Sequence, residues 1–204
     1  MRTRTLRAWL ILGGALLVGA LLAAVAVAQT TSISFRMERS ESAVAQGADC
    51  LRGAYANVTV RTVGGNQIMD VTLRNAAPNT GFTLFVIQQP NAPFGVSWYQ
   101  GDLDTDNQGN GAVQVKGIFS EETFAFAPES VPAPQVDAQD AARNPAFDPV
   151  HTLHLGLWFA DPQEAQAAGC SGTVTPFDGD HEAGIQALST RTFPALQGPL
   201  GKIR

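Results

Sequence analysis

The chain has 204 residues, of which 45% are hydrophobic and 15% are charged, and its formal net charge at pH 7 is −5. This length and composition are sufficient for one domain with its own apolar core. The acidic balance argues against nucleic acid or an anionic lipid surface as a partner.

The first 28 residues have the pattern of an export signal. Three arginines precede a long apolar run, which ends in the small-residue sequence Ala-Val-Ala at 26–28. This pattern predicts a signal peptide that is cleaved before Gln29. The run is also about as long as the ~20 residues that span a bilayer, so an N-terminal membrane anchor is the alternative. Membrane contact is expected only through this segment.

In both cases the folded part is expected to be secreted or otherwise extracytoplasmic. Removal of the signal leaves ten basic and eighteen acidic residues, a net charge of −8.

Cys50 and Cys170 are the two cysteines of the chain. In an oxidising compartment such a pair favours one long-range disulfide over a catalytic thiol. Closure of so long a loop stabilises a fold by about 4 kcal/mol in the chain-entropy model. We therefore interpret residues 29–49 as an N-terminal extension or first strand and residues 50–204 as the folded domain.

From residue 54 to residue 159 the dominant spacing of apolar residues is two. Apolar and polar side chains alternate over 56–60 and 69–73, which predicts strands with one buried face. Residues 82–87 are apolar on both sides and predict a central strand. Further strands are expected at 96–104, 111–119, 122–126 and 151–159. This pattern predicts an all-β fold, an antiparallel two-sheet sandwich of immunoglobulin-like or jelly-roll type.

Two segments depart from this spacing. Residues 127–149 are rich in Pro, Ala and Asp and predict a long connection. Loops of this length are often functional, but a crossover that covers one end of the sandwich is favoured. In the second segment an acidic N-cap at Asp161, a proline after it and Gly169 predict a short helix near 162–169.

Asp102, Asp104 and Asp106 form an alternating set that resembles the start of a calcium-binding loop. The rest of the EF-hand pattern is missing, because its glycine and glutamate positions hold Asn107 and Val113. The local run of Asp, Asn and Gly is also what a tight turn between two strands requires. We therefore favour a hairpin loop, with calcium as the less favoured alternative.

His151, His154 and His181 all lie late in the chain, and His181 follows Asp180. Histidine and carboxylate side chains are ligands for zinc and copper. Because residues three apart on a strand point to opposite faces, only one of His151 and His154 can join His181 and Asp180. A structural role for each histidine is favoured, with a metal site as the alternative.

Trp98 and Trp158 are the candidates for a binding surface. Aromatic residues at strand spacing usually belong to the core, but two exposed tryptophans can stack against a sugar or a peptide. No serine stands in a nucleophile elbow. Glu121 and Glu122 are adjacent and therefore point to opposite faces of a strand, which does not suit a glycosidase pair. The sequence thus predicts no catalytic residue and no cofactor.

The strings PNTGFTLFV, NAPFGVSWYQGDLDTD and VHTLHLGLWFADPQEAQAAGC resemble segments of a group of uncharacterised exported bacterial proteins with a single domain. The resemblance covers nearly all of the mature chain and implies an extracytoplasmic location. That group has no established function, so the resemblance implies no activity and no site residues.

Three functions are compatible with the sequence. The favoured one is a non-catalytic extracytoplasmic binding or cell-surface interaction module of unknown ligand. The second is a metal-dependent protein or enzyme that holds zinc or copper at the late His/Asp cluster. The third is a structural component of the cell envelope.

Overall fold

The computed structural model describes residues 31–120, 124–125, 150–176 and 182–203. The expected export signal lies outside the described residues, as does the long connection at 127–149. No helix in the described ranges is both long enough and apolar enough to cross a membrane.

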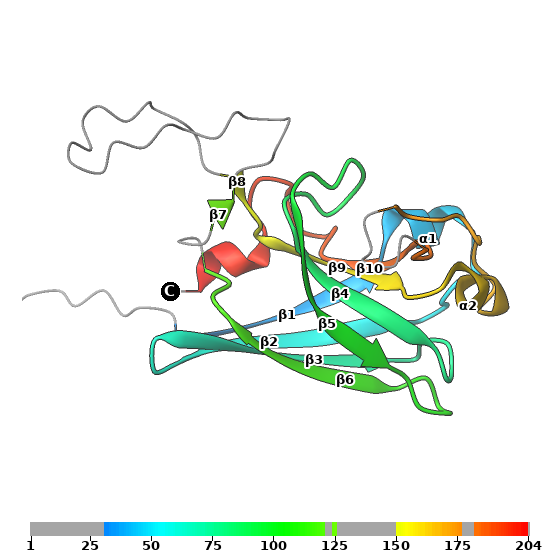
Figure 1. The fold of residues 1–204 in the computed structure, drawn as a ribbon, viewed down its shortest axis with the longest axis horizontal. Coiled ribbons are helices and arrows are strands. Elements are labelled where there is room, and N and C mark those ends of the chain that lie inside the picture. The colour runs from blue at the N-terminus through cyan, green and yellow to red at the C-terminus, as the bar shows by residue number, and fades with distance from the viewer. Residues whose placement is uncertain (1–30, 121–123, 126–149, 177–181, 204) are drawn as a thin grey trace, which may run out of the picture.

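The main structural unit is one antiparallel sheet of eight strands in the spatial order β5-β4-β9-β10-β1-β2-β3-β6 (Figure 1). Their bounds are β1 Ser32–Arg39, β2 Tyr55–Val63, β3 Asn66–Arg74, β4 Gly81–Ile87, β5 Ser97–Asp104, β6 Gly111–Gly117, β9 His154–Phe159 and β10 Gln186–Ser189. A separate short pair consists of β7 Phe124–Ala125 and β8 Val150–His151. The described part of residues 29–49 contributes β1, a central strand that pairs with β10 and β2.

Within the described ranges, three short helical segments lie outside the sheet. They are α1 Glu41–Ala45, α2 Pro162–Ala167 and the 3-10 helix η2 Pro199–Lys202. Helix α2 confirms the prediction for 162–169, because the Asp161 carboxylate accepts the N–H of Gln163 at 2.5 Å and Gly169 follows with a φ of 77°. Figure 1 shows α1 and α2 together at one end of the sheet and η2 with the β7–β8 pair at the other.

The sheet curves round so that its two edge strands meet. β5 pairs with β4 and β6 pairs with β3, although β5 and β6 are consecutive in the sequence. A Cβ on Gly101 of β5 would lie 3.3 Å from Cγ1 of Val115 and 3.7 Å from Cγ2 of Val113. Because Gly101 has no side chain, these two valines of β6 fill the junction between the edges.

The all-β prediction is therefore confirmed, but the two-sheet sandwich is wrong. The strands form one continuous and nearly closed barrel-like sheet with a Greek-key connection from β3 across to β4. The alternation of apolar residues indicates which face of a strand is buried. It does not indicate whether two sheet edges meet, because that depends on curvature and on pairs far apart in the sequence.

The core fills the inside of this barrel. Alternate residues of β2 and β3 point inward and are almost fully buried, as the period-two spacing predicted: Ala56, Val58, Val60, Met69, Val71 and Leu73. β4 lies between β5 and β9 and is buried on both faces, which confirms it as a central strand. The outer side of β4 belongs to a second, smaller apolar cluster formed by Phe85, Ile87, Trp158 and Phe94.

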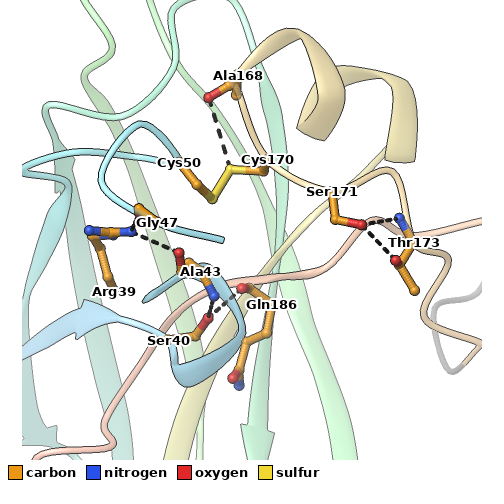
Figure 2. Close-up of a disulfide and its surroundings, with 10 residues drawn as sticks. All are labelled: Arg39, Ser40, Ala43, Gly47, Cys50, Ala168, Cys170, Ser171, Thr173 and Gln186. Atoms are coloured by element: carbon orange, nitrogen blue, oxygen red, sulfur yellow. Dashed lines mark hydrogen bonds between the residues drawn. A yellow bond between two sulfur atoms is a disulfide. The ribbon is translucent and has the colours of Figure 1, made fainter. Parts of the chain in front are cut away.

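A disulfide joins Cys50 and Cys170 across a sequence separation of 120 residues, as predicted (Figure 2). Cys50 follows α1 and Cys170 follows α2, so the bond connects the two helical loops at one end of the barrel. Ser40 links α1 to the sheet. Its hydroxyl accepts the N–H of Ala43 in α1 at 3.0 Å and donates to the carbonyl of Gln186 in β10 at 2.5 Å. The disulfide end of the molecule is thus tied to β10.

Candidate functional site

A cleft of about 470 Å³ opens between β5 and β6, where β5 begins and β6 ends. Its volume is within the range of roughly 300–1,000 Å³ that is usual for small-molecule sites, and barrel mouths are a frequent place for such sites. Its apolar lining consists of Val86, Val96, Trp98, Tyr99, Ile118 and Phe119. Gln100, Lys116 and Thr152 are the polar and charged residues of the lining.

A bulge in β5 orients the residues of this cleft. Gly101 pairs with Leu84 and Tyr99 pairs with Phe85, which leaves Gln100 as an extra residue between them. Bulges of this kind redirect the side chains around them. Trp98 consequently pairs with Val86, whose side chain belongs to the core, and so lies on the inner face of the strand.

Trp98 is nevertheless 65% exposed, because it stands at the open mouth of the barrel. On the opposite side of the opening, β6 ends at Gly117, which has no side chain to cover the indole. Val113 and Val115 pack against Gly101 and hold β5 and β6 together there. Toward the start of β5 and the end of β6 the two strands separate, and the cleft lies between them.

Phe119 forms the inner wall of the cleft. Its ring passes over Gly117, since a Cβ there would lie 2.9 Å from Cζ of the phenyl ring. The backbone N–H of Phe119 donates to the side-chain carbonyl of Gln67, which is itself buried. Because both the ring and the backbone are held, this wall is a fixed surface.

Exposed apolar residues gather at the rim of the cleft. Tyr99 is 52% exposed and Ile118 is 56% exposed, and both line the cleft together with Trp98. The Tyr99 ring meets Phe85 edge-on at 6.1 Å, and its hydroxyl donates to Oδ2 of Asp102 at 3.0 Å. Clustered exposed apolar side chains of this kind often mark a site of interaction, whereas a single exposed one is ordinary.

The structure separates the two tryptophans of the predicted binding surface. Trp158 is 1% exposed and lies in the second apolar cluster, where its ring meets Phe85 at 5.5 Å and Phe94 at 5.0 Å. Phe94 comes from the segment between β4 and β5 and covers the outer face of β9. A surface shared by Trp98 and Trp158 is therefore ruled out by burial, and Trp98 alone is accessible.

His154 has a structural position, as favoured from the sequence. It is fully buried, its Nε2 donates to the carbonyl of Ala195 at 3.1 Å, and its Nδ1 lies 2.9 Å from the hydroxyl of Thr190. Burial lowers the pKa of His154, while the Ala195 carbonyl acts in the opposite direction. Both ring nitrogens are thus used within the protein and neither is directed to a metal.

Of the other members of the predicted metal cluster, the structure describes only His151. His151 is half-buried in β8, and His181 and Asp180 lie outside the described residues. Within the described part of the chain, no three His, Cys, Asp or Glu side chains are close enough to hold a metal ion together.

The three aspartates of the predicted calcium set have separate contacts. Oδ1 of Asp106 accepts the backbone N–H groups of Gln108 at 2.8 Å and Asn110 at 2.9 Å. Both hydrogen bonds lower the pKa of the Asp106 carboxyl, and the one from Asn110 has the larger effect. Asp102 accepts the hydroxyl of Tyr99, and Asp104 lies beside Gly81.

The segment is therefore a tight loop that Asp106 stabilises. The loop differs from the expected hairpin, because the two strands that flank it are not paired with each other. β5 pairs with β4, and β6 pairs with β3.

Sequence reasoning missed most of the residues that line the cleft with Trp98, in particular Lys116, Ile118 and Phe119. One signal for them was present. Lys116 and Ile118 fall on the face of β6 opposite to Val113 and Val115, so Ile118 is an apolar residue on the polar side of a strand.

Comparison of the chain with protein-family models and with curated proteins gave no match. The function is therefore inferred from the cleft itself.

Proposed function

We propose that this protein is a non-catalytic extracytoplasmic binding module whose ligand occupies the cleft between β5 and β6. The observation that carries the proposal is the position of Trp98, which is 65% exposed at the rim of a cleft of about 470 Å³. Tryptophan dominates many binding sites, because it offers a large rigid surface at low entropic cost. A pocket with mostly apolar walls and a few polar groups is the usual form of a small-ligand site.

The composition of the lining supports binding in preference to catalysis. The described residues of the cleft include no carboxylate, imidazole or thiol. Acid–base and nucleophilic chemistry most often uses such groups in hydrogen-bond contact with each other. The exposed apolar surfaces of Trp98, Tyr99 and Ile118 instead provide area for contact, and Phe119 closes the cleft from inside.

An extracytoplasmic location is supported by two independent features. The first 28 residues have the pattern of an export signal. The Cys50–Cys170 disulfide belongs to a class of bonds that persists mainly in oxidising compartments. The resemblance to exported bacterial proteins points to a secreted or envelope protein of a bacterium.

Binding of N-phenyl-1-naphthylamine, a neutral probe that fluoresces in apolar surroundings, tests this proposal on the chain from Gln29 to Arg204. We expect saturable binding of one equivalent and a rise in melting temperature, because a ligand that binds only the folded state stabilises it. Trp98→Ala should weaken binding by about thirtyfold, the equivalent of roughly 2 kcal/mol for a residue that dominates a site.

Leu196→Ala is the matched control, since Leu196 is 88% exposed and lies outside the cleft lining. This variant should bind the probe as the wild type does. Absence of saturable binding to the wild type, or equal affinity of the Trp98→Ala variant, would show that the cleft is not a ligand site.

A further inference from the structure

Among the described residues that line the cleft, Lys116 is the one that carries a charge. The mature chain has an excess of acidic residues and a net charge of −8, and it contains only two lysines, Lys116 and Lys202. Lys202 lies over the ring of Phe193, with Nζ 5.6 Å from the ring centroid. One of the two lysines in a strongly acidic protein therefore stands at the cleft.

Lys116 has no counter-ion in the described structure. The ion pairs among the described residues are Arg36–Glu38 and Arg61–Asp70, and no described carboxylate oxygen lies within 4.0 Å of the Lys116 ammonium. A cation that is not neutralised from within the protein remains available to an anionic group of a ligand.

The strand geometry places the charge at the rim and the apolar surface inside. Lys116 pairs with Ile68 of β3, one residue before β6 ends. Its side chain leaves the backbone on the outer face of β6. A lysine side chain is long enough to lay its apolar stem along a neighbouring surface while its ammonium stays in water. Trp98 and Phe119, in contrast, lie on the inner side of the opening.

The other polar side chains in the described lining, Gln100 and Thr152, compete weakly with Lys116 for an anion. The side-chain N–H of Gln100 already donates to the backbone carbonyl of Trp98 at 3.2 Å. The hydroxyl of Thr152 is neutral and makes a weaker hydrogen bond to an anion than an ammonium does.

We infer that the cleft selects small organic anions with a flat apolar body, which packs against Trp98 and Phe119 while the negative group meets Lys116 at the rim. This inference rests on the proposed binding function and adds the chemical class of the ligand. It predicts that removal of the charge at position 116 weakens binding of anions and spares neutral molecules of the same shape.

Two probes that differ in one group test this inference. 8-Anilino-1-naphthalenesulfonate has the same ring body as N-phenyl-1-naphthylamine and carries a sulfonate in addition. We expect the wild type to bind the sulfonate probe more tightly. Lys116→Gln should weaken that binding about fivefold, the effect of one solvent-exposed ion pair, and should leave the neutral probe within about twofold. Added salt should weaken only the sulfonate probe.

Lys202→Gln removes the other lysine and is the matched control, so it should change neither affinity. A second measurement needs no variant: the sulfonate probe should protect Lys116, and not Lys202, from acetylation in the wild-type chain. Equal affinities of the two probes for the wild type, or unchanged sulfonate binding by Lys116→Gln, would overturn the anion selectivity. Binding of the neutral probe that depends on Trp98 would in that case still support the binding function. Failure of both probes to saturate would overturn both proposals.

Discussion

Gly156 of β9 lies directly beneath the indole ring of Trp158. A Cβ on Gly156 would be 2.2 Å from Cζ3 of that ring and 2.8 Å from Nε2 of Gln186. Both side chains are almost fully buried on the outer face of the sheet. The missing side chain at Gly156 therefore provides the space in which the second apolar cluster is built.

Gly156→Ala should lower the free energy of unfolding by about 1–3 kcal/mol, because an extra methyl in a filled region forces its neighbours to move. Urea unfolding followed by tryptophan fluorescence measures this loss. Gly201→Ala is the control, since a Cβ there would be 3.2 Å from Cδ1 of Leu153, the flexible end of a side chain. Equal stability of the Gly156→Ala variant and the wild type would contradict the packing of Trp158 over this glycine.

Replacement of both Cys50 and Cys170 by alanine should lower the free energy of unfolding by about 2–5 kcal/mol. The bond closes a loop of 120 residues and so restricts the unfolded chain strongly. Urea unfolding with and without dithiothreitol tests this expectation. The reductant should lower the midpoint of the wild type and leave the double variant unchanged. A wild-type midpoint that is insensitive to full reduction would show that the disulfide does not stabilise the fold.

Acidification below neutral pH should destabilise the protein through His154. Burial lowers the pKa of His154 in the folded state below its ordinary value of 6.5, so the unfolded chain binds the proton more tightly. The contribution to stability is complete above about pH 6.5 and is lost as the pH falls from there toward the folded pKa. The slope for one proton is at most about 1.4 kcal/mol per pH unit.

Urea unfolding between pH 5.5 and pH 8 checks the assignment to His154. The wild type and His151→Gln, the matched control, should both lose stability toward the acidic end. His154→Gln should be less stable at pH 8 and should have a flatter profile. A profile that keeps its slope in His154→Gln would assign the pH dependence to another group.

Asp106→Ala should lower the melting temperature, because the backbone N–H groups of Gln108 and Asn110 lose their acceptor. Asp106→Asn retains a side-chain oxygen and should lower it less. Thermal melts at pH 7, with calcium and with chelator, provide the measurement. A rise in the melting temperature with calcium that is present in the wild type and absent from Asp106→Ala would reverse our interpretation of this loop, since the carboxylate would then be a calcium ligand.

Features that depend on neighbours in the sequence were predictable. The alternation of side chains along a strand indicated that Val58 and Val71 are buried, because it is a property of the extended backbone itself. The cap at Asp161 and the proline after it predicted α2, because caps act within one helical turn. The disulfide followed from the presence of only two cysteines in a chain with an export pattern.

Features that depend on distant parts of the chain were decided only by the tertiary structure. Trp98 and Trp158 both lie in strands of aromatic character, yet one is 65% exposed and the other 1% exposed. The difference arises because Phe94 covers Trp158, whereas Trp98 stands at an opening of the barrel. Lys116 lines the same cleft as Trp98 only because the two edges of an eight-stranded sheet curve together. Spacing along a strand carries no information about that closure, which is set by curvature and by side-chain packing between edges.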